Sequence, residues 1–254
     1  MLYTHPQPDE NELSKYYQSE DYISHTDTKR NFFEWVYQWV RTITLKRKVK
    51  LINSFDTSSK RLLDIGCGTG DFLKQAQKAK WEVIGIEPNE QARSVANEKV
   101  GKKVFSEKEL ENLDKASFDV ITLWHVLEHL PNLEEKILQI KTLLKPKGIL
   151  IIAVPNFKSY DATHYYSFWA AYDVPRHLWH FSRTSILKLF QPIGFELVKT
   201  LPMKFDAYYV SLLSEKYKSG FMNPFKAFWI GFKSNLKART TKEYSSLIYV
   251  LRKN

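Results

Sequence analysis

The amino-acid sequence predicts an α/β protein with a mostly parallel β-sheet covered by helices on both faces. Between Lys60 and Val154, short apolar segments alternate with amphipathic segments of helical length. This alternation is typical of a parallel sheet whose strands are joined by helices. The first apolar segment, RLLDI, runs directly into the glycine-rich turn GCGTG, and a helical pattern follows. With 254 residues, 43% of them hydrophobic, the chain is long enough for one large domain with additions.

The first 59 residues are predicted to form a helical cap, and residues 60–254 the main domain. The segment LSKYYQSEDYISH has a helical pattern, and from Thr28 to Phe55 apolar residues recur at helical spacing. Four side chains of the cap are candidates for a lid that excludes water from a site: Tyr16, Tyr17, Tyr22 and His25. Plain packing against the main domain is an equal alternative.

The elements of the main domain can be assigned in order. Strands and helices alternate through RLLDI, DFLKQAQKAK, EVIGI, NEQARSVANEK, KKVF, FDVITLW, LEEKILQIKTLLK and GILIIAV, with a turn at 145–148 before the last of them. An aromatic-rich loop without secondary structure of its own is expected at 155–181, and loops of this length are commonly functional. A helix that begins after Ser182, the strand FELVKTL, a helical insertion at 206–242 and a final strand, YSSLIYVLRK, complete the chain.

The glycine turn and one acid indicate the ligand. Gly66, Gly68 and Gly70 stand between a strand and a helix, where a backbone without Cβ atoms can approach a nucleotide closely. Glu87 ends the second strand, 21 residues after Gly66, where a carboxylate suits the two hydroxyls of a ribose. Turn and acid together indicate a ligand that contains adenosine. The spacing of the glycines differs from that of dinucleotide-binding domains, whose last glycine follows three positions after the second.

The pattern DxGxGxG, from Asp64 to Gly70, resembles the first motif of class I S-adenosylmethionine-dependent methyltransferases. The similarity continues along the chain: IGIEPN at 84–89 resembles the second motif of that family, FDVITLWHVLEHL at 118–130 the fourth, and LLKPKGILIIAVPN at 143–156 the fifth and sixth. The resemblance implies an open sheet of seven strands whose last strand is antiparallel and lies beside the fifth. It also implies S-adenosyl-L-methionine as cofactor and S-adenosyl-L-homocysteine as product.

Motif positions then imply roles for individual residues. Asp64 and the turn residues Gly66, Cys67, Gly68 and Gly70 would surround the methionine end of the cofactor, with Cys67 a small filler rather than a nucleophile. Glu87, followed by Pro88, would bind the ribose. Trp124 and His125, just beyond the fourth strand, would lie near the sulfonium. Residues 107–110 are weakly matched candidates for contact with the adenine.

Methyl transfer to a hydroxyl needs an aligned nucleophile and a base, and histidine titrates near neutral pH. His125 follows a strand at the carboxyl edge of the sheet, and His177 and His180 lie in DVPRHLWHFS. This segment is part of the loop at 155–181, which the resemblance implies is the substrate loop, with the acceptor beneath it. These three are the candidate catalytic residues, with a structural role as the alternative. His129, in VLEHL, is expected on a helix after the fourth strand, and together with Glu128 it resembles the corresponding segment of ubiquinone-pathway O-methyltransferases. For His129 a structural hydrogen bond is favoured over catalysis. No metal is required by this chemistry, and none is predicted.

Charge and composition restrict the partners. From Lys199 to Asn254 there are eleven Lys and Arg residues and three acids, so the basic character is concentrated in the last fifth of the chain. Residues 220–242, basic and aromatic, are either a lid over a substrate pocket, a peripheral contact with a membrane or part of the core. The leading hypothesis is methylation of a hydroxyl on a small-molecule acceptor: a sugar, a phenol or a lipid-linked intermediate.

Two other functions stay open. A methyltransferase acting on nucleic acid is disfavoured, because no NPPY-type tetrad follows the fourth strand, which reads TLWHVL. The other alternative is a non-catalytic protein that binds the cofactor or its product. The sequence shows no apolar run of the ~18 residues that a membrane-spanning helix needs and no signal-peptide pattern. The expected location is therefore the cytoplasm, with peripheral contact with a membrane as the alternative.

Overall fold

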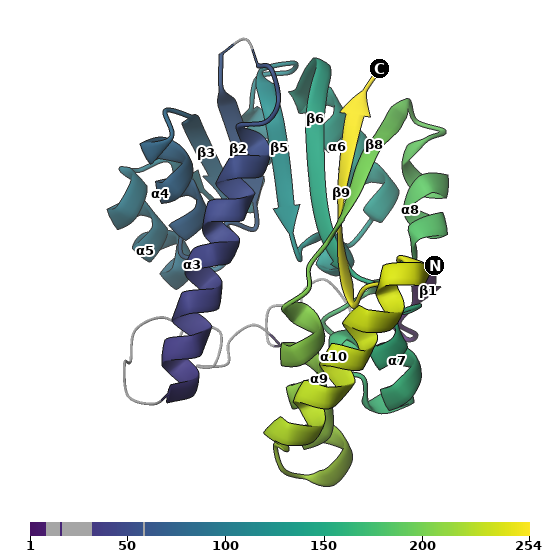
Figure 1. Ribbon diagram of the computed structural model, residues 1–254. Helices are drawn as coiled ribbons and strands as arrows, with labels where there is room; N and C mark the ends of the chain where they lie inside the picture. Colours follow the sequence, from purple (N-terminus) through teal and green to yellow (C-terminus); the bar gives the residue numbers. More distant parts are fainter. Residues whose placement is uncertain (9–15, 17–31, 58) are drawn as a thin grey trace.

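The computed structural model describes residues 1–8, 16, 32–57 and 59–254. Seven strands form one sheet in the order β4-β3-β2-β5-β6-β9-β8 (Figure 1). They are β2 (Arg61–Ile65), β3 (Glu82–Ile86), β4 (Val104–Phe105), β5 (Phe118–Trp124), β6 (Leu144–Pro155), β8 (Phe195–Pro202) and β9 (Ser246–Lys253). Strand β9 lies between β6 and β8 and runs antiparallel to both, whereas the other pairs of this sheet are parallel. The predicted mostly parallel sheet is confirmed. The antiparallel last strand is also confirmed beside the fifth predicted strand, GILIIAV, which is part of β6.

Helices cover both faces of this sheet. The helices are α3 (Phe32–Ile52), α4 (Asp71–Lys78), α5 (Glu90–Val100), α6 (Leu133–Leu143), α7 (Tyr160–Tyr165), α8 (Arg183–Phe190), α9 (Asp206–Ser219) and α10 (Pro224–Thr241). Buried side chains of α3, α4 and α5 pack on one face, and those of α6 and α8 pack on the other (Figure 1). Because β5 and the second half of β6 are buried along their length, their near-continuous apolar sequences match a sheet covered on both faces.

Three local expectations were wrong. The segment VLEHL forms a short 3-10 turn, η3 (Leu127–His129), in place of a helix. The loop at 155–181 contains α7, the 3-10 turns η4 (Tyr166–Phe168) and η5 (Ala170–Tyr172), and the short strand β7 (Trp179–His180). The expected turn at 145–148 lies inside β6, where the pairing with β5 shifts in register. Propensity identified these segments, but tertiary packing decided their conformation.

The structure describes only part of the predicted N-terminal cap. Helix α3 covers residues 32–52 of the expected helix at 28–55, and its Ile52 lies in the core beneath the sheet. Two N-terminal residues form β1 (Leu2–Tyr3), which pairs with β7. Tyr16 is exposed. The candidate lid residues Tyr17, Tyr22 and His25 lie outside the described residues, as does nearly all of LSKYYQSEDYISH.

A helical lobe made of α7, α9 and α10 stands beyond the carboxyl ends of the parallel strands (Figure 1). The buried carboxylate of Asp161 holds it together by accepting hydrogen bonds from Trp169 Nε1 at 2.8 Å, Ser234 Oγ at 2.6 Å and Ser245 Oγ at 2.7 Å. These donors come from the loop after α7, from α10 and from the residue before β9. One side chain therefore joins α7 and the loop after it to α10 and to the start of β9.

Within the described parts of the chain, we find no helix with both the length and the hydropathy that crossing a bilayer requires.

Candidate active site

The glycine turn links β2 to α4 and contacts the end of β5. Gly66 and Cys67 donate backbone hydrogen bonds to Ile86 O at 2.7 and 3.1 Å. Gly66 has a φ of 69°, and a Cβ atom there would lie 2.4 Å from Val126 Cγ2. Only glycine therefore fits this position, since both the backbone conformation and the close approach of Val126 exclude a side chain. The packing places the residues that follow β5 directly beside the turn.

Gly68, at the apex of the turn, differs from Gly66. Its φ of 53° also favours glycine, but a Cβ atom there would have no neighbour within 4 Å. The space above Gly68 is open, so a ligand can approach its backbone. This is the arrangement that the motif predicts for a cofactor cradle.

Glu87 is buried, with 1% of its surface exposed, and its carboxylate joins the turn to the end of β3. Oε2 accepts a hydrogen bond from Gly68 N at 2.8 Å, and Oε1 accepts one from Asn89 N at 2.9 Å. Burial raises the pKa of Glu87, and the two backbone hydrogen bonds oppose this shift. A carboxylate oxygen has lone pairs for more than one donor, so both oxygens retain capacity for ribose hydroxyls.

Asp64, at the end of β2, is buried beside a lysine that the sequence analysis did not single out. Its Oδ1 accepts a 2.6 Å hydrogen bond from Thr122 Oγ1. Burial raises the pKa of Asp64 to about 7, although the hydrogen bond from Thr122 and the charge of Lys48 act in the opposite direction. Burial likewise lowers the pKa of Lys48 to about 8, against the attraction of Asp64 and Asp206. Lys48 comes from α3, so the cap contributes a cation to the site.

The remaining predicted cofactor residues surround the same turn. The Cys67 sulfur packs against Gly85, and burial raises the pKa of its thiol, consistent with a filler. Gly70 precedes α4 and lies against Ala96 of α5. Pro88 is exposed beyond Glu87. The Trp124 ring packs edge-on against Phe72, 5.7 Å between centroids, and Lys48 Nζ lies 4.2 Å from its centre.

His125 is held between two carboxylates. Its Nδ1 lies 3.3 Å from Glu128 Oε1 and its Nε2 lies 3.2 Å from Asp206 Oδ2. Burial alone would lower the pKa of His125, but the hydrogen bonds to Asp206 and Glu128 raise it to about 10. Its backbone φ of 58° is unusual for a non-glycine residue, and such strained positions occur frequently at functional sites. With a proton on each nitrogen, this ring donates to both carboxylates and has no lone pair with which to accept a proton.

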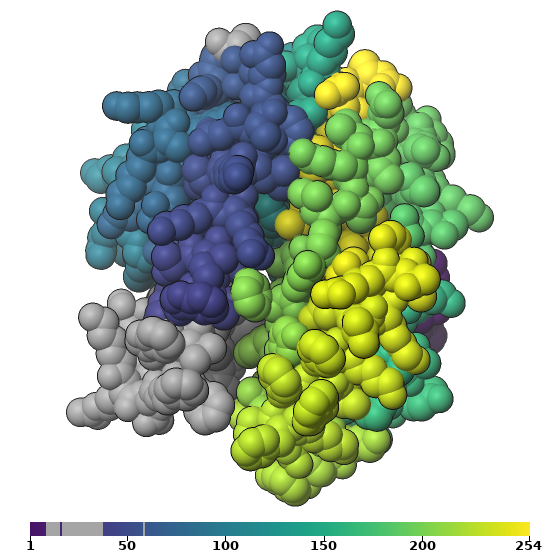
Figure 2. All heavy atoms as spheres, viewed as in Figure 1, coloured from purple at the N-terminus to yellow at the C-terminus, as the bar shows by residue number. Residues whose placement is uncertain are grey.

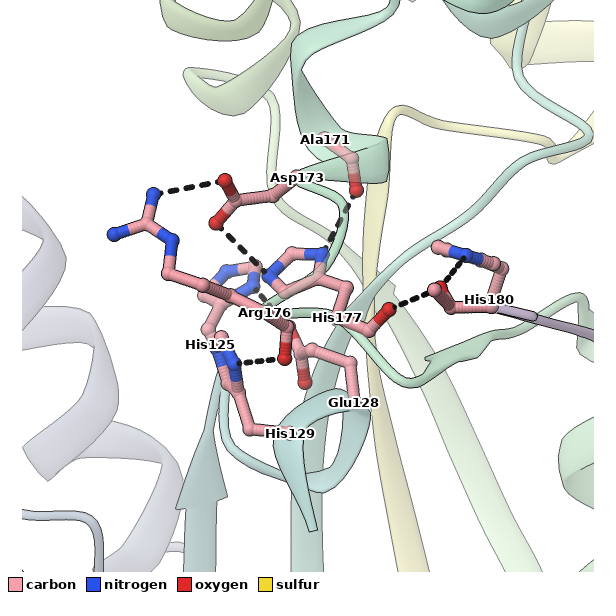
Figure 3. Close-up of polar contacts among 9 residues, drawn as sticks. His125, Glu128, His129, Ala171, Asp173, Arg176, His177 and His180 are labelled. Carbon is pink, nitrogen blue, oxygen red and sulfur yellow. Dashed lines mark hydrogen bonds and ion pairs between the residues drawn. The ribbon is translucent and has the colours of Figure 1, made fainter. Parts of the chain in front are cut away.

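The loop that contains His177 and His180 is fastened to the turn after β5 (Figure 3). Leu178 N donates to Glu128 O at 2.8 Å, and Trp179 Nε1 donates to Leu130 O at 2.8 Å. Burial lowers the pKa of His177 to about 4. His180 is buried on β7, where its Nε2 lies 3.3 Å from Thr4 Oγ1, and burial lowers its pKa also. His177 therefore lies next to the Glu128 turn, whereas His180 faces the N-terminal strand.

A cleft of about 390 Å³ lies between α3 and the segment that follows β8 (Figure 2). Lys48 and Asp206 both line it. Lys48 also contacts the Trp124 ring, and Asp206 contacts His125. Phe205 closes one side, with the Arg47 guanidinium 5.6 Å from its ring centre. The cleft thus opens onto the end of β5, and three further basic residues line it: Arg47, Lys50 and Lys204. Sequence reasoning placed the acceptor under 155–181, whereas none of the residues that line this cleft comes from that loop.

The residues at the carboxyl edge fit S-adenosylmethionine. The open space above Gly68 admits a ligand against the backbone, the Glu87 carboxylate can accept from ribose hydroxyls, and Asp64 offers a carboxylate for the cationic amino group. The residues at 107–110 fall in the 3-10 turn η2 (Glu107–Asn112), with Leu110 buried, and their contact with adenine stays a prediction. When bound, the cofactor supplies an electrophilic methyl group.

Comparisons with known sequences agree with this geometry. A model of the methyltransferase domain family matches residues 39–200, more than half of the chain. The ubiquinone biosynthesis O-methyltransferase of Paraburkholderia phymatum is 33% identical over 112 residues, which cover 41% of this chain and 48% of that protein. The protein of the same name from Rickettsia bellii is 30% identical over 155 residues, which cover 58% and 62%. The chain therefore spans only about half to three fifths of the length of these relatives.

Solved structures show the same fold at lower identity. Magnesium protoporphyrin IX methyltransferase from Synechocystis, with S-adenosylhomocysteine bound, superposes with a TM-score of 0.64 at 17% identity, over 97% of this chain and 100% of that one. A SAM-dependent methyltransferase from Archaeoglobus fulgidus gives 0.56 at 18% identity, over 88% and 100%. The family model, the sheet order and the glycine turn agree: the chain belongs to the class I S-adenosylmethionine-dependent methyltransferases.

Proposed function

We propose that this chain transfers the methyl group of S-adenosylmethionine to a hydroxyl of a small-molecule acceptor. The observation that carries the proposal is the pair His125 and Asp206, 3.2 Å apart, between the glycine turn and the cleft. The similarity to ubiquinone biosynthesis O-methyltransferases favours oxygen as the atom that is methylated. The basic residues of the cleft favour an acceptor that carries negative charge, or a phenol that ionises readily.

The chain's own groups have two tasks in this reaction. The cleft must align the acceptor oxygen behind the methyl carbon, and alignment is the larger part of catalysis for a reactive sulfonium. The Asp206 carboxylate, held by His125, is the group in the cleft that can accept the proton of the hydroxyl. Lys48 lines the same cleft, with its ammonium group 4.2 Å from the centre of the Trp124 ring.

The test is release of S-adenosylhomocysteine by the purified protein, saturated with S-adenosylmethionine and supplied with a panel of acceptors. The panel contains phenols, sugars and polyprenyl-linked catechols, with single-stranded RNA and double-stranded DNA as the competing class. Turnover on a hydroxyl compound supports the proposal. Turnover on nucleic acid alone contradicts it, as does cofactor binding without transfer to any acceptor, which would indicate a non-catalytic binding protein.

Two variants address the acid–base pair. Asp206→Asn keeps the shape of the side chain but removes its charge, and His125→Gln removes the group that holds it. Both should lower turnover by ~10²–10⁴ while the affinity for S-adenosylmethionine changes little. Glu196→Gln, an exposed position on β8, is the matched control and should retain normal turnover. Near-normal turnover of Asp206→Asn would contradict its role as the proton acceptor.

We also propose that α10 contacts an anionic membrane surface. The side chains of α10 that pack inward are small: Ala227, Gly231, Ser234 and Ala238. Its large aromatic side chains are exposed: Phe225 by 82%, Trp229 by 64%, Phe228 by 54% and Phe232 by 43%. This distribution is the inverse of an ordinary surface helix, and of the three alternatives for this segment it argues against the core. Neighbouring lysines make the face suitable for anionic lipid.

Vesicle flotation tests this contact. Vesicles of phosphatidylcholine with about one third phosphatidylserine should bind the protein. Vesicles of phosphatidylcholine alone should bind it weakly, because they lack the anionic lipid that attracts the basic side chains. The double variant Phe225→Ser with Trp229→Ser should lose most of the binding. Trp39→Ser, which removes an exposed tryptophan of α3, is the control and should bind normally. A double variant that binds like the original, or a dimer that dissociates when these side chains are removed, would contradict the membrane assignment.

A further inference from the structure

Three potential metal ligands converge where the loop after β6 meets the turn after β5. Glu128 and His129 belong to η3, and His177 belongs to the loop that precedes β7. One ligand atom from each of the three lies within 4.8 Å of the others (Figure 3). Glu128 is almost fully buried and His177 is buried. The cluster is therefore built by tertiary structure from two segments 48 residues apart.

Both imidazoles are oriented by backbone carbonyls. His177 Nδ1 lies 2.9 Å from Ala171 O, and His129 Nδ1 lies 3.1 Å from Arg176 O. A carbonyl oxygen only accepts hydrogen bonds, so Nδ1 carries the proton in each ring and Nε2 carries the lone pair of the neutral form. Metal-binding histidines have this arrangement, with the second ring nitrogen donating to a carbonyl or carboxylate.

One carboxylate oxygen of the cluster is buried without a hydrogen-bond donor among the described residues. Glu128 Oε1 accepts from His125 Nδ1, but Oε2 is buried and has no hydrogen-bond partner among the described residues. Asp173 Oδ2 lies 3.7 Å from His177 Nε2, which is too long for a hydrogen bond. A buried carboxylate oxygen without a donor is costly, and a cation at this point would satisfy Oε2 of Glu128.

We propose that Glu128, His129 and His177 bind one divalent transition-metal ion, of which Zn²⁺ fits best, with Asp173 in position to act as a fourth ligand. Two imidazole nitrogens and a carboxylate suit Zn²⁺, which takes four ligands in tetrahedral geometry. Mg²⁺ and Ca²⁺ prefer sites made of oxygen atoms alone. The ion would pair with Oε2 of Glu128 while Oε1 remains on His125, so metal occupancy and the orientation of His125 are linked through one carboxylate.

The site can be tested without any methyl transfer, so its failure is separate from failure of the proposed activity. The full chain is stripped with a chelator and titrated with Zn²⁺ by calorimetry, with Mg²⁺ in a parallel titration. The expected result is one equivalent of Zn²⁺ bound and no saturable binding of Mg²⁺ in the same concentration range. Substitution of Co²⁺ for Zn²⁺ should then give the visible absorption of a tetrahedral site with nitrogen and oxygen ligands. No binding of Zn²⁺, or tighter binding of Mg²⁺ than of Zn²⁺, overturns the proposal.

Variants identify the ligands. His177→Ala and Glu128→Gln should each weaken Zn²⁺ binding by at least ~10-fold, the lower end of what loss of even a supporting group costs at such sites. His180→Ala is the matched control, because His180 is three residues away in the same loop and is also buried, but faces Thr4. It should bind Zn²⁺ as the original does. Glu128→Gln keeps the side-chain volume, and circular dichroism confirms that each variant is folded. Equal Zn²⁺ affinity in the original, in His177→Ala and in Glu128→Gln would place the ion elsewhere and overturn the assignment.

Discussion

The backbone N–H of Gly68 donates a 2.8 Å hydrogen bond to the carboxylate of Glu87, 19 residues later. The glycine turn after β2 and the acid after β3 are therefore one unit rather than two independent motifs. A ligand that binds to the turn meets a carboxylate already fixed by its backbone.

Replacing Glu87 should weaken the cofactor site. Glu87→Ala removes the acceptor for Gly68 and Asn89 and the carboxylate available to the ribose, so the affinity for S-adenosylmethionine should fall by roughly 1–3 kcal/mol, as measured by calorimetry. Glu90→Ala, an exposed acid at the start of α5, serves as control and should change the affinity little. An unchanged dissociation constant for Glu87→Ala would assign the ribose to another residue.

Two glycines offer a matched comparison. Gly68 and Gly101 both have positive φ, 53° and 76°, and a Cβ atom at either would meet nothing within 4 Å. Gly68→Val and Gly101→Val should therefore lower the melting temperature by similar amounts, because each carries the same backbone strain of about 1–2 kcal/mol. Only Gly68→Val should lose cofactor binding. If both variants bind the cofactor equally well, the open space above Gly68 is not the cradle.

The buried carboxylate of Asp64 should make stability depend on pH. Its pKa is raised from 3.8 to about 7, so between these values the folded chain holds a proton that the unfolded chain has released. The free energy of unfolding that Asp64 contributes therefore falls as pH rises from about 4 to about 7, and is constant above that window. Urea unfolding across this range should show this contribution as the difference between the original chain and Asp64→Asn, whereas the exposed control Asp114→Asn should follow the original chain.

The same group should couple cofactor binding to protons. The cationic amino group of S-adenosylmethionine favours the ionised form of Asp64, so affinity should increase with pH up to about 7 and binding below that pH should release a proton. Calorimetry in buffers of different ionisation enthalpy measures this release. Lys48→Met removes a charge that holds the pKa of Asp64 down, and should move the window to higher pH. A proton balance of zero at about pH 6 would contradict the contact between Asp64 and the amino group.

The helical lobe should depend on Asp161. Asp161→Ala leaves three buried donors, Trp169 Nε1, Ser234 Oγ and Ser245 Oγ, without their acceptor, and should cost at least ~3 kcal/mol in the free energy of unfolding. The exposed Asp114→Ala should cost little. Denaturant titration followed by tryptophan fluorescence gives both values, and a loss for Asp161→Ala within the error of the control would remove this network as the basis of the lobe.

The fold was predictable because its signals are local. The apolar segments from RLLDI to GILIIAV, and the turn that contains Gly68, each express their structure within a few residues. The order of the strands followed from the resemblance to a known family, which the family model confirms. The position of β9 between β6 and β8 could not have been derived from composition or periodicity alone.

Sequence patterns predicted the residues of the site that belong to a local motif, such as the glycine turn. Lys48 and Asp206 escaped notice because each is an ordinary charged residue on a helix, and nothing in the sequence shows that α3 and α9 bring them to the end of β5. Glu128 was noted only beside His129, and its contact with His125 depends on a 3-10 turn where a helix was expected. Side chains that meet across the fold leave no spacing pattern in a single sequence.

The pairing of β1 with β7 sets an order of events during synthesis. Leu2 lies opposite His180, and Thr4 Oγ1 donates to His177 O, 173 residues later. These N-terminal residues are synthesised long before their partners, so β1 is unpaired while the chain from β2 to β6 is being made. The loop that contains His177 reaches its final position only when both ends of this contact are present. A nascent chain can thus fold its glycine turn early, but it completes the surroundings of its histidines only after β7 has been made.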